Sequence, residues 1–403
     1  GRAKRRHPGG DRDDRPGPPA KLELRGRRVA IVSRTIPDVV IVGGGVIGCA
    51  IAHALVAEGA SVTVLERAHV GSESSGAAAG ILAPRVHATF EGMFDLALAS
   101  HAKFPPLVDS LRAETGIEVE YVRSGVLDLA HDESREVLLR DKVQWLRQAG
   151  HDVDWLGRDD VLRTEPTLDP SIRGAFYDAD AYHIHPLRFT QALAQAAARR
   201  GARFELGVEG VGLDHEGARA TRLRTPTGDV PAGHIVLAPG AWASVCGDWL
   251  GVPIAVFPAK GQILTVSAVP TPIRTVIFGA DAYLLPRVDG TIVVGATVER
   301  AGFDKGLTAR AIGWLLTVIP SLCPALADAR IERAWAGLRP GSPDDLPIIG
   351  PAPGWDNVTI ATGHFRNGII LAPITASFVA DLVLRGQSND LLQPLSPTRF
   401  MKS

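Results

Sequence analysis

The segment DVVIVGGGVIGCAIAHALVAEGASVTVLER, residues 38–67 of the 403-residue chain, constrains the fold more than any other. Residues 39–42 are continuously apolar, as in a buried strand of a parallel sheet, and residues 62–65 are also apolar at three of four positions. Between them lies an alanine-rich stretch with the composition of a helix, which we expect to end near Gly59. The order strand, helix, strand predicts a βαβ unit of the Rossmann type.

Glycines at the first strand-to-helix turn predict a nucleotide site. Gly43, Gly45 and Gly48 form the pattern GxGxxG. The first two allow a tight turn and bring a pyrophosphate close to the helix N-terminus, and Gly48 lets the helix pack closely on the strand. Glu66 ends the second strand, where a carboxylate can accept both ribose hydroxyls and would repel a 2′-phosphate. A glycine-rich turn without a ligand is the alternative, but the first strand, the helix, the second strand and Glu66 at its end all agree with a bound cofactor.

The segment GSESSGAAAGILAP, residues 71–84, distinguishes FAD from NAD. It consists mainly of small residues and hydroxyls, so its backbone can run close along a pyrophosphate and a flavin. A nicotinamide dehydrogenase would more often continue directly into another helix and strand. The segment therefore favours FAD.

Composition narrows the class of partner. The chain has 43 Lys and Arg against 44 Asp and Glu, and this balance argues against a nucleic acid or an anionic membrane as the main partner. Three cysteines lie far apart and lack metal-ligand spacing, as in the core of a protein from a reducing compartment. The HxH pair His183 and His185 lacks further ligands, so no metal is predicted. We expect a soluble, cytoplasmic protein that acts on a small molecule.

The chain is predicted to alternate between two domains after a disordered extension at residues 1–35, and we expect the natural chain to start near Val32. The fold class is α/β: a Rossmann-type FAD-binding domain with an interleaved antiparallel-sheet substrate domain. The FAD-binding domain is assigned residues 36–100, 186–252 and 326–395, and the substrate domain residues 101–185 and 253–325. Amphipathic patterns predict helices at 100–114 and 134–149, and alternating patterns predict strands within 261–299.

Two further segments carry candidate chemistry. In AWAGLRPGSPDDLPIIG, Arg339 is either the ion-pair partner of Asp344 or Asp345, or a clamp for a ligand carboxylate. GHFRNG, residues 363–368, is a second glycine-rich strand-to-helix turn. A helix N-terminus there could stabilise negative charge on a reduced flavin, or the turn could be an ordinary one capped by Asn367.

These stretches together resemble the glycine oxidase and D-amino-acid oxidase family of flavoproteins. The resemblance is carried by VVIVGGGVIG, SSGAAAGIL, AYLLPR, VVGATVE, WAGLRPGSPDDLPIIG and GHFRNGIILAP, extends from Asp38 past Leu384, and is nearest to glycine oxidases of thiamine biosynthesis. It implies noncovalent FAD, a small amino-acid substrate and molecular oxygen. The implied reaction is hydride transfer to flavin N5 without a dedicated base, giving imine, glyoxylate, ammonia and hydrogen peroxide.

The resemblance also implies site residues. Val46 and Ile47 would lie under the pyrophosphate, Glu66 and Arg67 near the ribose, and Val208 or Gly210 near the adenine. The flavin and pyrophosphate would be lined by Ser74, Ser75, Ala79, Gly80 and Ile81, and the other flavin edge by His364, Phe365, Arg366, Asn367, Gly368, Ile369 and Ile370. Arg339 and Tyr283 would hold the substrate carboxylate, with Arg366 as a second substrate-side arginine. Tyr283 is otherwise a core tyrosine with a backbone-bonded hydroxyl.

Several alternatives stay open within this fold. Sarcosine-oxidase-like enzymes attach FAD to a cysteine, but Gly337 stands at the corresponding position here. Ile81 and Val298 replace methionines expected from the family, so the preference among glycine, sarcosine and small D-amino acids is open. A dehydrogenase that passes electrons to a quinone or a protein, and a flavin-binding module without oxidase activity, are the other classes. A tRNA-modifying oxidase is disfavoured by the neutral charge. Family analogy implies a homo-oligomer, a tetramer.

Overall fold

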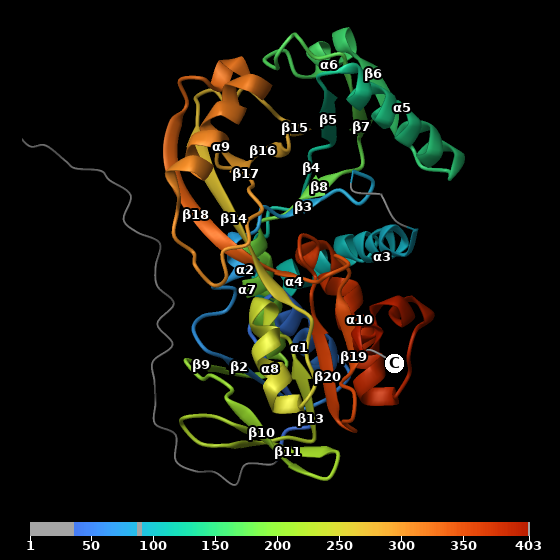
Figure 1. The fold of residues 1–403 in the computed structure, drawn as a ribbon, viewed down its shortest axis with the longest axis vertical. Coiled ribbons are helices and arrows are strands. Elements are labelled where there is room, and N and C mark those ends of the chain that lie inside the picture. Colours follow the sequence, from blue (N-terminus) through green and yellow to red (C-terminus); the bar gives the residue numbers. More distant parts are fainter. Residues whose placement is uncertain (1–35, 87–90, 402–403) are drawn as a thin grey trace, which may run out of the picture. The chain divides into compact units, whose positions relative to one another are not determined.

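The computed structural model describes residues 36–86 and 91–401, which belong to one compact unit. The predicted disordered extension at residues 1–35 lies outside the described residues. Two large sheets organise the fold, one in the lower and one in the upper part of Figure 1.

The lower sheet has six strands and contains the predicted βαβ unit. Its order is β19 (Ile348–Pro351), β20 (Val358–Thr362), β13 (His234–Leu237), β1 (Val39–Val42), β2 (Val62–Glu66) and β9 (Arg203–Leu206). All neighbours are parallel except β19 and β20. Helices pack on both faces, which explains why the strands are continuously apolar.

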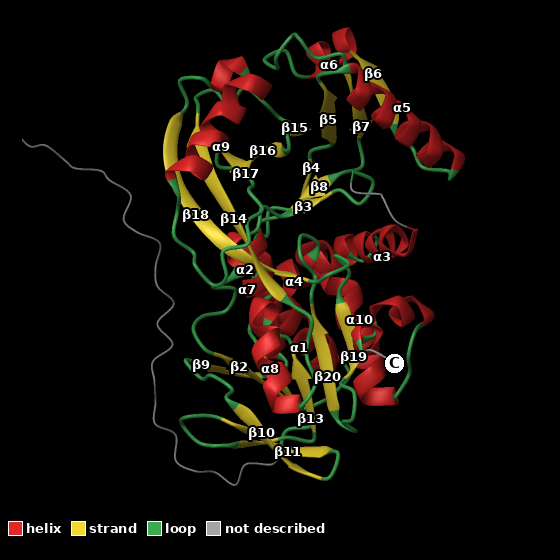
Figure 2. Cartoon of the chain, in the orientation of Figure 1, coloured by secondary structure: helices red, strands yellow, loops and turns green. Residues whose placement is uncertain are grey.

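The two faces of the six-stranded sheet are buried by different helices (Figure 2). Val39 and Ile41 lie in the core shared with α1 (Val46–Ala57), α7 (Pro186–Arg199) and α10 (Gly368–Arg385). Val40 and Val42 lie in a second core with α8 (Ala243–Leu250). The alternation follows from the two-residue period of side chains along a strand.

The upper sheet has eight strands and is antiparallel except between β15 and β5. Its order is β18 (Arg330–Gly341), β14 (Phe257–Ser267), β17 (Thr291–Gly295), β16 (Ala282–Pro286), β15 (Val276–Gly279), β5 (Val126–Ala130), β7 (Gly174–Asp178) and β6 (Asp154–Gly157). The helices packed on it include α5 (Glu133–Gln148), α6 (Arg158–Thr164) and α9 (Ala309–Leu322).

The remaining elements are short. Two three-stranded sheets are formed by β3 (Ile81–Leu82), β8 (Tyr182–His183) and β4 (Val122–Arg123), and by β10 (Gly212–Glu216), β11 (Arg219–Arg224) and β12 (Val230–Pro231). The other helices are α2 (Ser74–Ala77), α3 (Glu91–His101) and α4 (Phe104–Thr115), with 3-10 turns at Gly240–Trp242, Pro324–Leu326, Asp390–Leu395 and Pro397–Phe400.

The structure differs from the predicted elements in two places. The helix predicted around 100–114 is confirmed as α4, but its predicted start is wrong: α3 ends at His101 and α4 begins at Phe104, with Pro105 and Pro106 in its first turn. Proline lacks the N–H that would continue a preceding helix, so it suits only the start of a new one.

The elements also depart from the predicted domain assignment. Phe104 and Leu111 of α4 lie in the core of the six-stranded sheet, although α4 falls in the stretch 101–185 assigned to the substrate domain. β18 pairs with β14 in the eight-stranded sheet, although the stretch 326–395 was assigned to the FAD-binding domain.

Helix α10 is long and apolar enough to span a membrane. Within the described residues it packs against α1 and α3, and 61% of its 18 residues are buried inside the protein. Its hydropathy is therefore accounted for by burial in the core of the six-stranded sheet.

Candidate active site

A cavity of about 980 Å³ is lined by residues from both large sheets. One part of its wall is formed by the glycine-rich turn after β1, the end of β2 and the segment containing α2. The other part is formed by the start of α10 and by side chains of the eight-stranded sheet, among them Tyr283 and Arg339. The carboxyl ends of parallel strands are where ligands bind in such folds.

The glycine-rich turn leaves no room for side chains. Gly43 has φ +110°, which favours glycine, and a Cβ there would collide with the carbonyl oxygen of Ala238. A Cβ on Gly48 would collide with the carbonyl oxygen of Gly43, so α1 could not lie as close to β1. The turn therefore brings the N-terminus of α1 to the cavity wall.

The Glu66 carboxylate is fixed at this end of the cavity by two backbone amides. Its Oε2 accepts from the Gly44 N–H at 2.8 Å and its Oε1 from the Ala68 N–H at 2.8 Å. Each carboxylate oxygen can accept more than one hydrogen bond, so both keep capacity for hydroxyl donors of a ligand.

Arg67 and Trp242 form the next part of the wall. The guanidinium of Arg67 lies 3.8 Å from the centre of the Trp242 ring and 3.0 Å from Glu73. Glu73 also pairs with Lys305 at 3.1 Å, and Trp242 stacks on Phe303 at 5.3 Å. Trp242 was missed in the sequence, although it lies in the short glycine-containing turn that follows the apolar strand β13.

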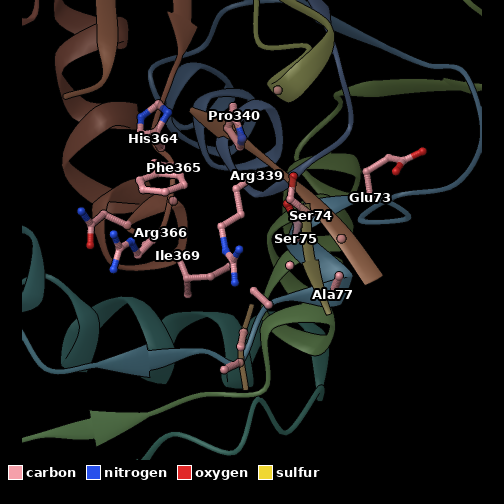
Figure 3. A pocket seen from close by; sticks show the side chains of 18 of the residues that line it. Glu73, Ser74, Ser75, Ala77, Arg339, Pro340, His364, Phe365, Arg366 and Ile369 are labelled. Carbon is pink, nitrogen blue, oxygen red and sulfur yellow. The ribbon is translucent and has the colours of Figure 1, made fainter. Parts of the chain in front are cut away.

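The segments predicted to line the flavin face each other across the cavity. Figure 3 shows Ser74, Ser75 and Ala77 on one side and Phe365, Arg366 and Ile369 on the other, with Arg339 between them. Ser75 Oγ accepts the Val46 N–H at 2.9 Å. On the opposite side, the Phe365 N–H donates to the Pro340 carbonyl at 2.9 Å, which joins this turn to β18.

His364 stands behind the second of these segments. Its Nε2 lies 3.0 Å from Thr375 Oγ1, and burial lowers the pKa of His364 to about 3. The imidazole is therefore neutral near pH 7. Asn367 occupies the N-cap position of α10 but its side chain makes no capping hydrogen bond, so the alternative of a turn capped by the Asn367 side chain does not hold.

Arg339 is a cation without an acidic partner among the described residues. Its Nη1 donates to the Thr297 carbonyl at 3.0 Å. The predicted alternative, an ion pair with Asp344 or Asp345, does not form: Asp344 pairs with Arg399 at 2.8 Å, and neither carboxylate lies within ion-pair distance of Arg339. Burial lowers the pKa of Arg339; Tyr283 opposes this effect, and Arg366 adds a smaller effect in the same direction as burial. A guanidinium nevertheless stays protonated in proteins, so the cavity wall carries an unneutralised charge.

Tyr283 and Arg366 share the cavity with Arg339. The Tyr283 ring lies over Gly295, where a Cβ would collide with its hydroxyl. Burial raises the pKa of Tyr283 to about 12, so its hydroxyl is a donor at neutral pH. Arg366 is exposed, and its guanidinium lies 4.9 Å from the Phe365 ring. Tyr283, Arg339 and Arg366 thus supply three donors to the wall of one cavity.

Most of the predicted site residues are brought together here. Those lining the cavity are Gly43, Gly45, Val46, Ile47, Glu66, Arg67, Ser74, Ser75, Ala79, Gly80, Ile81, Val208, Gly210, Tyr283, Arg339 and residues 364–369. Gly48 does not line it because it packs α1 on β1, and Ile370 does not because it is buried in the core. Their contacts with a ligand stay predictions.

The fold and the site define a flavoprotein of the Rossmann type. A family model described as FAD dependent oxidoreductase matches residues 38–382. The glycine oxidases of Geobacillus kaustophilus and Bacillus subtilis are 35% and 32% identical over 368 and 357 residues. Those alignments cover 90% and 87% of this chain, and 97% and 94% of the relatives.

The bifunctional protein ThiO/ThiG of Synechocystis sp. is 35% identical over 376 residues. The alignment covers 91% of this chain but 55% of the relative, so the chain spans about half the length of that protein. Among solved structures, glycine oxidase from Geobacillus kaustophilus matches with a TM-score of 0.88 at 34% identity, covering 91% of this chain and 99% of that chain. L-proline dehydrogenase from P. horikoshii, at 24% identity and a TM-score of 0.83, shares the fold.

The chain belongs to the family of FAD-dependent oxidoreductases. Two features of its cavity fit noncovalently bound FAD. The turn at Gly43 and the two amides that hold Glu66 form a cradle at the nucleotide end. At the other end, a Cβ on Gly337 would lie 2.6 Å from the Cβ of Ala77, so a cysteine has no room there. This agrees with noncovalent binding.

Proposed function

We propose that this chain is a flavin-dependent oxidase of glycine and of related small amines such as sarcosine or small D-amino acids. The observation that carries the proposal is Arg339, a cation that faces the cavity and has a neutral carbonyl as its hydrogen-bond acceptor. Such a group is costly to bury unless a ligand supplies the missing negative charge. A substrate carboxylate supplies it, and a planar guanidinium binds it through two parallel hydrogen bonds.

The other two donors would complete carboxylate binding. Tyr283 stays protonated near pH 7 because burial raises its pKa to about 12, so its hydroxyl can donate to a carboxylate oxygen. Arg366 adds a second positive charge at the start of α10. A carboxylate anchored at Arg339 orients the neighbouring C–H and amine in the cavity without a dedicated base.

Within this proposal the chemistry balances. Glycine loses two electrons and two protons to become iminoacetate, which water hydrolyses to glyoxylate and ammonia. The electron acceptor is bound FAD, which oxygen reoxidises as it takes up two electrons and two protons to form hydrogen peroxide. The protein's part is to bind the carboxylate, to orient the substrate and to keep water from the reacting carbon.

The bifunctional relatives support a role in supplying the imine for the thiazole of thiamine, because about half of each such protein matches this chain. We infer a cytoplasmic location and a homotetramer from the family resemblance alone.

Anaerobic addition of glycine, sarcosine and D-alanine to the purified yellow protein tests the function. Loss of the flavin absorption band establishes oxidation and ranks the three substrates. Hydrogen peroxide release after oxygen is admitted then separates an oxidase from a dehydrogenase that uses another acceptor. A flavin that none of the three compounds reduces would remove the proposed activity and leave the cofactor assignment intact.

A further inference from the structure

Arg287 lies immediately after β16 and behind the cavity wall. Its Nη1 donates to the carbonyl of Ile184 at 2.9 Å, and its Nη2 donates to the carbonyl of Ala79. Ala79 lines the cavity, whereas Arg287 does not. One guanidinium therefore joins the eight-stranded sheet to two separate segments of the chain, one of which forms the wall of the cofactor site.

The charge of Arg287 is not neutralised by an ion pair within the described part of the chain. The two carboxylates whose charges act on Arg287 have other partners: Glu120 pairs with Arg188 at 2.7 Å, and Asp289 accepts from the Thr291 backbone and hydroxyl at 3.0 and 2.7 Å. Burial lowers the pKa of Arg287, but an arginine remains charged. The field of Arg287 extends to the cavity, because it is one of the two charges that lower the pKa of Tyr283 against the larger effect of burial.

A second side chain of the same sheet holds the same wall segment. The Trp335 indole N–H donates to the Ala77 carbonyl at 3.1 Å. Beyond Ala79, the Gly80 carbonyl accepts from the Ile184 N–H at 2.9 Å, and Gly80 has φ +84° with no room for a Cβ beside the Ile184 carbonyl. Residues 77–80 are thus fixed by one neutral donor, one charged donor and one backbone bond.

We propose that Arg287 is a positioning residue that anchors the flavin-facing segment 77–81 and raises the reduction potential of bound FAD through its unneutralised positive charge. Reduction adds two electrons to the flavin and increases its negative charge. A fixed positive charge in a partly water-excluded region stabilises the reduced state more than the oxidised state. The inference depends on FAD binding and not on the identity of the substrate, so it can fail or hold independently of the proposed function.

The test compares variants that differ in the side-chain donors that hold residues 77–80 and in the charge at position 287. Arg287→Gln removes a donor and the charge, Trp335→Phe removes a donor of the same segment and no charge, and Arg287→Lys keeps the charge. The reduction potential of each holoenzyme is measured by equilibration with a reference dye, and the FAD dissociation constant by fluorescence titration of the apoprotein. Both measurements are independent of turnover.

We expect weaker FAD binding in both Arg287→Gln and Trp335→Phe, because each loosens the wall. Only Arg287→Gln should lower the equilibrium constant for flavin reduction, by about tenfold or more, which corresponds to about 30 mV for a two-electron couple. Arg287→Lys should keep most of the potential. Equal potentials in Arg287→Gln and Trp335→Phe would overturn the electrostatic role, and unchanged FAD affinity in both would overturn the anchoring role.

A further variant keeps the idea testable if Arg287→Gln does not retain FAD. Asp289→Asn neutralises an exposed carboxylate whose charge acts on Arg287, and Asn can keep the hydrogen bonds to Thr291. The reduction potential of bound FAD should rise in this variant. The equilibrium constant for flavin reduction should increase by roughly two- to threefold, since the charges involved are partly screened. A potential that stays the same or falls in this variant would contradict the proposal.

Discussion

Replacing Arg339 by leucine separates the requirements of the substrate from those of the fold. Leucine keeps part of the apolar side chain and removes both the charge and the fork of donors. In the structure Arg339 has a carbonyl acceptor and no carboxylate, so its removal breaks no ion pair of the described protein. The Thr297 carbonyl loses one donor, but Thr297 is only half-buried and its neighbours Ala296 and Val298 line the cavity, so water can replace that donor.

The size of the effect on catalysis follows from the pairing that Arg339 is proposed to make. Removing one partner of a hydrogen-bonded charge pair in a partly buried site costs about 2–4 kcal/mol. At about 1.4 kcal/mol per factor of ten, kcat/KM for glycine should fall by about 30-fold to 1,000-fold. The free energy of unfolding should stay the same or increase, since an unpaired cation is costly to bury.

Steady-state peroxide release, FAD content and thermal unfolding of the holoenzyme measure these quantities together. Arg339→Lys is the matched control: it keeps the charge, loses the fork and should lie between the wild type and Arg339→Leu. Near-normal kcat/KM in the leucine variant would refute the carboxylate clamp. A large decrease in the free energy of unfolding with normal FAD content would refute the view that Arg339 binds the ligand and does not stabilise the fold.

Three other perturbations test separate parts of the structure. Gly48→Ala should abolish FAD binding, since its Cβ would collide with the Gly43 carbonyl, whereas Gly313→Ala in α9 meets no atom within 4 Å and should be neutral or stabilising in thermal unfolding. Thr297→Val leaves the buried Gln262 N–H without its acceptor at 2.8 Å and should raise the KM for glycine severalfold through Arg339, an effect of about 1 kcal/mol, while Thr297→Ser should restore it. Between pH 6.5 and 5, urea titrations should show the free energy of unfolding decreasing as pH falls. In this pH range, histidines whose pKa is lowered by burial bind protons in the unfolded state but not in the folded state. These are His183, His185 and His234, with a pKa of about 4, and His364, with a pKa of about 3. An unchanged free energy over this range would contradict the burial of these imidazoles.

Features with local requirements could be predicted from the sequence. The glycine turn and Glu66 belong to one βαβ unit, in which strand, turn and helix lie within 30 residues, so their spacing determines their geometry. The candidate site also combines residues from distant segments. That combination was predicted from the family resemblance, and not from any pattern around Tyr283 or Arg339 alone.

Long-range partners could not be predicted. The sequence suggested the neighbouring Asp344 or Asp345 as a partner of Arg339, but the acceptor is the Thr297 carbonyl, 42 residues away, and Asp344 pairs with Arg399. Arg287 and Trp335 were read as parts of motifs, without a role. Their acceptors are backbone carbonyls, which every residue has and no sequence pattern marks.

The position of β20 in the six-stranded sheet has a consequence for synthesis on the ribosome. β20 pairs with β13, and the turn after it leads into α10, which packs on α1 near the start of the chain. Until residues 358–385 have left the exit tunnel, the nascent chain therefore has an unpaired edge at β13 and an uncovered apolar face on α1. Residues 364–369 also complete the cofactor cavity. The nucleotide cradle, although made before these residues, can accept FAD in its finished form only after the segment up to residue 385 has been made, and the earlier segments must be kept from aggregation until then.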